Sequence, residues 1–292
     1  MSESEQPRVH RKRSLPERLL RGLYALGFHS PLLRGPLLLR VFSTPIRATG
    51  KVASLPPEAQ EAWLEAGSRF RTVRFGQGPR IFFVHGWGGD LGQMLSLANA
   101  AVALGNEAVL LDLPAHGSSP GKRTNGWEAA RAIERVASEY GQPDAIVAHS
   151  FGALAAGIAI GLGVTPQRLA LIAPLPSLAW AAEDFALKVK VPTGFMAKVA
   201  RAFARRLGLE PERLDLGAEG PHRALPTLVI HDRGDRIIPV RQSERLVQNW
   251  PLGSLIVTEG LGHARILGDQ DVRERVLAFL SDKASSPKIA SV

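Results

Sequence analysis

Short apolar runs recur along the chain, with almost no polar residues inside them. Six of these runs, each three or four residues long, are Ile81–Val84, Ala108–Leu111, Ala145–Val147, Leu169–Ile172, Leu228–Ile230 and Leu255–Val257. A strand with one face in water alternates apolar and polar residues, whereas a strand that is buried on both faces does not. The runs are therefore predicted to be strands of a parallel sheet that is covered on both sides.

Segments with helical periodicity separate these runs. They are predicted at Leu91–Leu104, Trp127–Tyr140, Ala153–Gly161, Gln242–Asn249 and Val272–Leu280. Strands that alternate with helices are typical of an α/β fold, in which helices cover a mostly parallel sheet. An antiparallel strand is expected before the first run, at Phe70–Phe75, with a turn at Gly76-Gln77-Gly78.

The segment between Pro174 and Pro226 interrupts this alternation. It has no strand pattern, and two helices are predicted in it, at Leu178–Val189 and Phe195–Leu207. We assign residues 175–225 to a helical cap, residues 52–174 and 226–282 to the core, and residues 283–292 to a flexible tail. Large apolar side chains of the cap either line a substrate pocket or form the cap's own core: Trp180, Phe185, Phe195, Met196 and Phe203.

The charge of the chain is concentrated at its N-terminal end. The 292 residues carry 36 Lys and Arg against 27 Asp and Glu, a net charge of +9 that by itself suggests nucleic acid or an anionic membrane as a partner. Ten of these bases and three of these acids lie in residues 1–51, which leaves 26 bases and 24 acids for the rest. The body is therefore close to neutral, and no nucleic-acid partner is expected.

Residues 1–51 are predicted to form a basic helical extension. Ser14 and Glu17 have the spacing of a capping box and precede leucines at helical intervals, and Ser30-Pro31 opens a second short helix with a kink expected at Gly35-Pro36. Two roles stay open for the extension: its bases contact an anionic membrane, or its leucines dock on the body. Arginine, glutamate, glycine and proline interrupt its apolar runs, so no secretory signal is expected. The most apolar tract of the chain, residues 145–173, is broken by His149, Ser150 and Gln167-Arg168, so no membrane span is expected either.

The residue types exclude several kinds of chemistry. The chain has no cysteine, which removes disulfides, thiolate metal sites and a cysteine nucleophile, and this composition fits the reducing cytoplasm. No metal-ligand cluster or nucleotide-binding glycine pattern is evident in the sequence, so neither a metal nor a cofactor is expected.

The segment Ala148-His149-Ser150-Phe151-Gly152 lies directly between a predicted strand and a helix of small residues. A serine on such a sharp turn exposes its hydroxyl above the sheet, next to a helix N-terminus. Small residues two positions before and after the serine allow the turn, although Ala148 stands where glycine is usual. Ser150 is therefore the candidate nucleophile, and the alternative is an ordinary turn serine.

A second strand end carries the glycine-rich segment His85-Gly86-Trp87-Gly88-Gly89. Glycines let backbone N–H groups turn inward, as an oxyanion hole requires. We expect the N–H groups of Trp87 and Phe151 to hold the negative charge that develops on a carbonyl oxygen. His85 and His149 are expected to order these loops and not to react themselves.

Two further strand ends supply an acid and a base. Asp235 follows Leu228–Ile230, and His263 follows Leu255–Val257, so that Ser150, Asp235 and His263 each come after a separate strand. Ligands of such sheets bind at the carboxyl ends of the strands, where these side chains would meet. In this arrangement the histidine takes the serine proton, and the aspartate holds the imidazole.

These residues give the chain a resemblance to the α/β-hydrolase fold superfamily, from about Arg71 to Leu280. The segment Asp112-Leu113-Pro114-Ala115-His116-Gly117-Ser118-Ser119 also resembles a segment that follows strand four in that superfamily. The resemblance implies an eight-stranded, mostly parallel sheet with a helical cap between strands six and seven. It implies Ser150 as nucleophile, Asp235 as acid and His263 as base, and Asp232 is the alternative acid.

The nucleophile narrows the reaction class. Epoxide hydrolases and dehalogenases of this fold use a carboxylate nucleophile, whereas a serine supports acyl transfer through an acyl-enzyme. We expect hydrolysis of a small carboxylic ester or thioester, and amidase, lactonase or acyltransferase activity are alternatives on the same triad. The competing class is a hydrolase-fold protein that only binds a ligand or docks to a partner.

Overall fold

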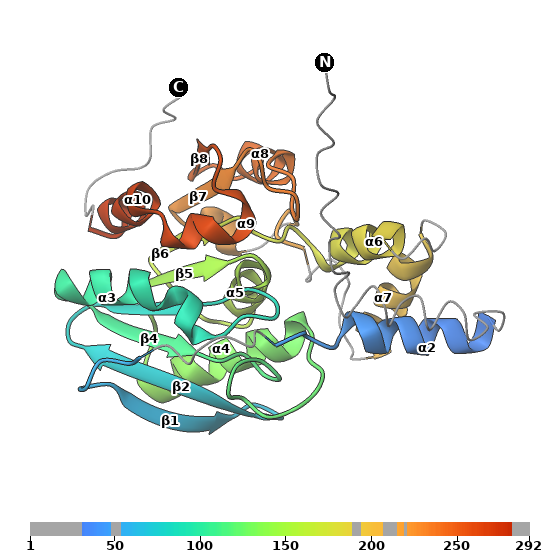
Figure 1. Ribbon diagram of the computed structural model, residues 1–292, viewed down its shortest axis with the longest axis horizontal. Helices are drawn as coiled ribbons and strands as arrows, with labels where there is room; N and C mark the ends of the chain where they lie inside the picture. Colours follow the sequence, from blue (N-terminus) through green and yellow to red (C-terminus); the bar gives the residue numbers. More distant parts are fainter. Residues whose placement is uncertain (1–30, 48–53, 189–193, 207–214, 219–220, 282–292) are drawn as a thin grey trace, which may run out of the picture.

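The computed structural model describes residues 31–47, 54–188, 194–206, 215–218 and 221–281. Its centre is an eight-stranded sheet between two layers of helices, with the strands in the order β1-β2-β4-β3-β5-β6-β7-β8 (Figure 1). β2 runs antiparallel to both of its neighbours, β1 and β4, whereas all pairs from β4 to β8 are parallel. The α/β architecture predicted from the apolar runs is confirmed.

The six predicted runs lie within the six parallel strands. The strands of the sheet are β1 (Gln60–Glu65), β2 (Arg69–Gly76), β3 (Arg80–Val84), β4 (Glu107–Leu111), β5 (Ala145–His149), β6 (Arg168–Ile172), β7 (Thr227–Asp232) and β8 (Gly253–Thr258). In β3, Phe82 and Val84 belong to the core on one face of the sheet, and Ile81 and Phe83 to the core on the other face. Both faces are thus apolar, because helices exclude water from both.

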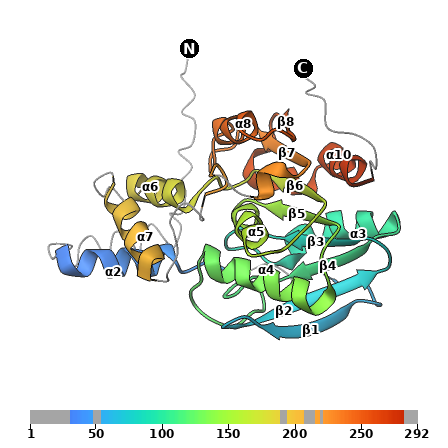
Figure 2. The same cartoon turned by 180° about the vertical axis from the view of Figure 1, so that it is seen from behind.

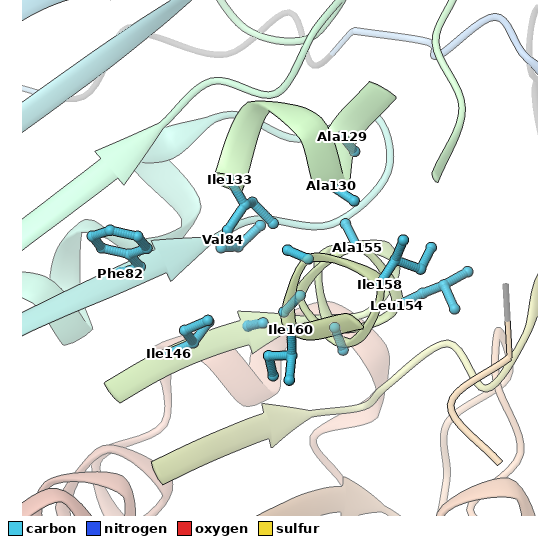
Figure 3. Close-up of a cluster of buried hydrophobic side chains, with 14 of the residues drawn as sticks. Phe82, Val84, Ala129, Ala130, Ile133, Ile146, Leu154, Ala155, Ile158 and Ile160 are labelled. Carbon is cyan, nitrogen blue, oxygen red and sulfur yellow. The ribbon is translucent and has the colours of Figure 1, made fainter. Parts of the chain in front are cut away.

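Five of the described helices form the two layers that cover the sheet. α4 (Gly126–Tyr140), α5 (Phe151–Gly161) and α8 (Arg241–Gln248) cover one face, and α3 (Leu95–Ala103) and α10 (Gln270–Ser281) cover the other (Figure 2). Figure 3 shows how Ala129, Ala130 and Ile133 of α4 meet Ala155 of α5 above the sheet. The alanines let the two helices approach closely, so that α5 is held directly over the central strands. This contact positions the helix that begins after Ser150.

The antiparallel end of the sheet differs from the expectation in one respect. The turn at Gly76-Gln77-Gly78 leads from β2 to β3, but β4 lies between these two strands, so the turn does not close a hairpin. The hairpin instead joins β1 to β2 around Gly67, whose φ is 77°. β1 was not predicted because it is an edge strand in which Leu64 alone is buried. An edge strand with one buried side chain has almost no apolar signal.

The described part of the segment between β6 and β7 includes the α-helices α6 (Leu178–Lys188) and α7 (Phe195–Arg206), which both lie within the residues assigned to a cap. α2 (Pro31–Phe42), from the N-terminal extension, packs beside them (Figures 1 and 2). Leu38 of α2 is only 1% exposed and shares a cluster with Met196 and two alanines of α6, against which Phe185 and Phe195 pack. These cap side chains therefore form a core that α2 helps to complete.

Other expectations for the extension are met in part. α2 runs as one helix through Gly35 and Pro36, and the helix predicted near Ser14 lies outside the described residues. The predicted tail, residues 283–292, and the side chain of Phe203 in the cap also lie outside the described part. Within the described part of the chain, no helix is both long and apolar enough to cross a membrane.

Candidate active site

Ser150 lies in the sharp turn between β5 and α5, with a backbone φ of 51° and ψ of −116°. A positive φ is strained for a residue with a side chain, and three backbone hydrogen bonds hold it. The Ser150 N–H donates to Ile172 O at 3.0 Å, and its carbonyl accepts from Ala153 and Leu175, both at 3.0 Å. The turn keeps the hydroxyl at the carboxyl edge of the sheet.

The residues two positions before and after Ser150 are both small, and the structure gives a different reason for each. A methyl group on Gly152 would lie 2.5 Å from the His85 carbonyl oxygen and 2.7 Å from that of Val84, so glycine is required there. Ala148 is fully buried in β5, opposite Val84 and Leu171 of the neighbouring strands. The sheet accommodates its methyl group, and the departure from the usual glycine leaves the turn intact.

His263 and Asp235 meet Ser150 at this edge. β5, β7 and β8 are parallel, so their carboxyl ends lie on the same side of the sheet, and His263 belongs to the short helix α9 (Gly262–Arg265) after β8. His263 Nε2 lies 3.0 Å from Ser150 Oγ, and His263 Nδ1 lies 2.6 Å from Asp235 Oδ2. The structure thus joins the three residues, 113 and 28 positions apart in the chain, through two hydrogen bonds.

Asp235 is surrounded by donors. Its Oδ1 accepts from the N–H groups of Ile237 at 2.7 Å and Ile238 at 3.0 Å, and its Oδ2 lies 3.2 Å from His231 Nε2 in addition to His263. Burial opposes ionisation of this carboxyl, but the hydrogen bonds from His231, His263 and Ile238 outweigh it and hold the Asp235 pKa well below its usual range. Asp235 is therefore an anion that faces His263 at neutral pH.

Asp232, the alternative acid, bonds to other groups. Its Oδ1 accepts from the Gly234 N–H at 2.9 Å, and its Oδ2 accepts from Thr258 Oγ1 and the Leu261 N–H, both at 3.0 Å. Within the described part of the chain, Asp232 makes no hydrogen bond to the His263 ring; it instead ties the end of β7 to the loop that carries His263. Of the two aspartates, Asp235 is the one in contact with the histidine.

The glycine-rich loop after β3 lies against Ser150, because β3 pairs with β5 and Val84 stands opposite Ala148. A methyl group on Gly86 would come within 3.1 Å of Ser150 Cβ. The rings of Trp87 and Phe151 meet edge to face, with centroids 4.9 Å apart. Among the described residues, no acceptor takes the backbone N–H of either one, so both donors are available at the serine.

Two buried histidines hold the loops around this turn. His85 Nε2 accepts from the Leu113 N–H at 3.0 Å, so its proton is on Nδ1, which donates to Gly86 O at 2.8 Å. His149 Nε2 donates to the backbone carbonyl of His263 at 3.0 Å. Burial lowers the pKa of His85 to about 4 and that of His149 to about 3. Both rings are therefore uncharged at neutral pH, and their hydrogen bonds hold these loops in place.

Three residues near the site were not singled out as functional by the sequence. His231 is fully buried, and it accepts from Ser243 Oγ at 2.7 Å and donates to Ile238 O at 2.8 Å. His116 is fully buried against Trp87 and Phe151. Arg47 donates to backbone carbonyls of the loop that carries His116. A histidine at the end of an apolar strand was the available signal for His231, whereas Arg47 had none. In the described part of the chain, no group of acidic residues and histidines could hold a metal ion.

The fold and the arrangement at this edge of the sheet are those of an α/β-hydrolase-fold protein. Residues 81–278 match the alpha/beta hydrolase family, and the chain belongs to that family.

Relatives of the chain include proteins with and without a known activity. It is 30% identical over 240 residues to an uncharacterised protein of Mycobacterium tuberculosis, and the matched region covers 78% of each of the two chains. It is 29% identical over 209 residues to the pimeloyl-[acyl-carrier protein] methyl ester esterase of Aeromonas salmonicida, and the matched region covers 70% of this chain and 74% of the esterase.

Solved structures share the fold. An esterase of Pyrococcus furiosus matches with a TM-score of 0.59 and 17% identity over 81% of this chain and 98% of its own. Est1E of Butyrivibrio proteoclasticus, solved with ferulic acid bound, matches with a TM-score of 0.58 and 16% identity over 76% of this chain and 100% of its own.

Proposed function

We propose that the protein is a serine hydrolase that cleaves a small carboxylic ester or thioester through an acyl-enzyme. The observation that carries this proposal is the hydrogen-bonded series from Ser150 through His263 to the ionised Asp235. Ser150 is the nucleophile, His263 the general base, and Asp235 the acid that holds the imidazole. Trp87 and Phe151 supply the N–H groups of the oxyanion hole.

In the first half of the reaction, Ser150 Oγ attacks the carbonyl carbon and His263 Nε2 takes the hydroxyl proton. The hydrogen bond from His263 Nδ1–H to Asp235 keeps Nε2 free to accept that proton, and the carboxylate stabilises the imidazolium. The N–H groups of Trp87 and Phe151 donate to the new oxyanion. The imidazolium then protonates the leaving alkoxide or thiolate, and the acyl group stays on Ser150.

In the second half, water replaces the leaving group. His263 Nε2 takes a proton from the water as its oxygen attacks the acyl-enzyme, and the same two N–H groups hold the oxyanion again. Collapse of this intermediate breaks the bond to Ser150 Oγ, which regains its proton from His263. The carboxylic acid is released, and no cofactor is needed for any of these steps.

The surface around Ser150 supports an apolar substrate. Among the described residues, six large hydrophobic side chains are exposed, and three of them belong to segments that adjoin the site. Trp87 belongs to the glycine-rich loop, Ile237 follows Asp235 by two residues, and the backbone of Ile46 lies against Gly88. Exposed apolar side chains at a polar reaction centre are typical of a site that binds an apolar group. We therefore infer an ester with an apolar acyl or alcohol part.

The relatives favour ester hydrolysis over the other reactions of this triad. The Aeromonas salmonicida protein is named for a methyl ester, and the Pyrococcus furiosus protein is named an esterase. Amides, lactones and transfer to another acceptor use the same chemistry, and a substrate panel separates them.

The test combines covalent labelling with turnover. A serine-directed fluorophosphonate is expected to label the wild type, and short p-nitrophenyl esters are expected to be hydrolysed. Ser150→Ala should abolish both, while Ser96→Ala, at an exposed serine of α3, should change neither. A wild type that neither labels nor turns over esters would favour a ligand-binding or docking protein. Undiminished labelling of Ser150→Ala would show that the nucleophile is another residue.

We further propose that the protein works in the cytoplasm and that residues 1–30 contact an anionic membrane surface. Six bases and three acids lie in these residues, and the missing cysteines fit a reducing compartment. The described part of the extension has another task, because Leu38 packs on the cap. Membrane contact is therefore confined to residues 1–30 in this proposal.

A further inference from the structure

The segment from Ser43 to Arg47 leaves α2 and crosses to the core beside Ser150. The Thr124 N–H donates to Ser43 O at 2.9 Å, which attaches the start of the segment to the loop before α4. Further along, the Ile46 carbonyl oxygen lies 2.7 Å from the place that a methyl group on Gly88 would occupy. With a φ of 74°, Gly88 belongs to the same loop as Trp87. The segment therefore touches the proposed oxyanion loop directly.

Arg47, at the end of this segment, binds a second loop with its guanidinium group. Nε donates to Ala115 O at 3.1 Å, and Nη1 donates to Gly117 O at 3.2 Å. Nη2 donates to Ser119 O at 2.7 Å and to Gly121 O at 2.8 Å. Four carbonyl oxygens thus converge on one cation, and without it their negative ends would face one another. A planar fork with five N–H donors fits this arrangement, whereas a lysine ammonium offers three donors at one point.

The bound loop has a conformation that needs such support. φ is 63° at Ala115, 46° at Gly117 and 104° at Gly121, so the backbone turns repeatedly through the left-handed region. Inside the molecule, the Asp112 carboxylate accepts from the Ser118 N–H at 2.9 Å. Arg47 holds the outer side of the same loop. The loop is therefore held between the buried Asp112 carboxyl group of the core and a cation of the N-terminal extension.

This loop carries His116 to the two proposed oxyanion donors. The His116 ring stacks on Phe151 with centroids 6.2 Å apart and meets Trp87 edge to face at 5.1 Å. Its Nδ1 donates to Pro114 O at 3.0 Å, and burial lowers its pKa to about 3, so the ring is neutral. Because the ring touches both donor residues, a shift of the loop would move Trp87 relative to Phe151.

We propose that Arg47 is a positioning residue of the oxyanion hole, which it fixes through the 115–121 loop and His116. Arg47, at the end of the described part of the N-terminal extension, then contributes to the geometry of the oxyanion hole. This inference rests on the proposed serine hydrolase function. An oxyanion hole works only when its donors are already in place, and a displacement of about 1 Å can cost on the order of 100-fold in rate. The predicted effect is therefore on kcat and not on substrate binding.

The experiment compares Arg47→Ala with Arg40→Ala in the full-length protein. Arg40 is an exposed arginine of α2 whose side chain bonds to no other described residue, so its removal takes away the same charge from the same segment. On a p-nitrophenyl ester, Arg47→Ala should lower kcat by roughly 10- to 100-fold with KM changed by less than about threefold. Arg40→Ala should leave both constants at the wild-type level. Millimolar guanidinium should restore part of the lost kcat in Arg47→Ala alone, because it can bind the four free carbonyls.

Equal kcat values for the two variants would overturn the proposal. If Arg47→Ala does not fold, Arg47→Lys replaces it, and an intermediate loss of kcat is expected because the ammonium cannot reach all four carbonyls. A wild type without Ser150-dependent hydrolysis would instead overturn the proposed function. In that case hydrogen exchange still tests whether Arg47 fixes the two loops. Amides of residues 85–89 and 112–121 should exchange faster in Arg47→Ala than in Arg40→Ala, and equal exchange rates in the two variants would refute this role of Arg47.

Discussion

Replacing either aspartate at the end of β7 by asparagine should give two opposite phenotypes. In Asp235→Asn, the two N–H groups of Ile237 and Ile238 will keep the amide oxygen at the Oδ1 position, since both donate there at 2.7 and 3.0 Å. The amide NH2 group must then face His263 Nδ1. It donates to that nitrogen and forces the imidazole proton onto Nε2, where it blocks transfer from Ser150.

The size of the effect follows from this tautomer. A histidine that holds the wrong tautomer in such a triad loses roughly 10⁴-fold in kcat, equal to about 5.5 kcal/mol of transition-state stabilisation. The NH2 group also faces the N–H of His231, which lies 3.2 Å from Oδ2. Asp235→Asn is therefore expected to lose nearly all turnover and some stability.

Asp232→Asn should behave in the opposite way. The carboxylate accepts from Gly234, Thr258 and Leu261, and an amide has only one oxygen for these donors on two sides. At least one of the two partly buried hydrogen bonds from the Gly234 and Leu261 N–H groups would be lost, which costs about 1 kcal/mol of unfolding free energy. Because the His263 ring keeps its own partner, kcat should fall by less than about tenfold.

The assay measures kcat on a p-nitrophenyl ester and the free energy of unfolding in urea for both variants. The reasoning predicts a large loss of kcat for Asp235→Asn, and a loss confined to stability for Asp232→Asn. If Asp232→Asn loses three orders of magnitude in kcat while Asp235→Asn keeps its turnover, the assignment of the acid is wrong.

Two further predictions concern pH and the extension. Burial lowers the pKa values of His85, His116 and His149 in the folded protein to about 4, 3 and 3, from 6.5 for an exposed histidine. At pH values between the folded and the exposed pKa, the unfolded chain therefore binds more protons than the folded protein. The unfolding free energy should therefore fall as the pH drops below 6.5, by up to about 1.4 kcal/mol per pH unit for each histidine. In urea titrations across this range His116→Phe should have a shallower pH dependence, and an unchanged slope would contradict the burial argument. In flotation assays at low salt, the full-length protein should bind phosphatidylglycerol vesicles and lose that binding when residues 1–30 are removed, with ester hydrolysis retained because Arg47 stays; no flotation of the full-length protein would contradict membrane contact.

The charge of the extension illustrates how position changes the meaning of a residue. In the sequence, Arg47 is one of ten bases that together suggest an anionic partner. In the structure its partners are four carbonyls of the same chain. The positive charge count was correct, but it did not separate a base that faces solvent from one that binds a loop 70 residues away.

Local patterns were sufficient for the frame of the fold. Six buried strands were visible because helices on both faces of the sheet force every position to be apolar, as in β3. The order of Ser150, Asp235 and His263 followed from the same pattern, since parallel strands bring their carboxyl ends to one edge. β1 was not predicted from the sequence, because its one buried residue, Leu64, gives no periodic apolar pattern.

Only the tertiary structure decided which groups are in contact. Asp232 and Asp235 stand three residues apart in one loop, and the direction of each side chain, set by the N–H groups around it, puts Asp235 alone on His263. His116 and Arg47 likewise reach the site from distant segments that carry no periodic pattern. Apolar periodicity is a property of neighbouring residues and can be read along the chain. Hydrogen bonds across loops depend on distances and angles that exist only after the sheet, the cap and the extension have packed together.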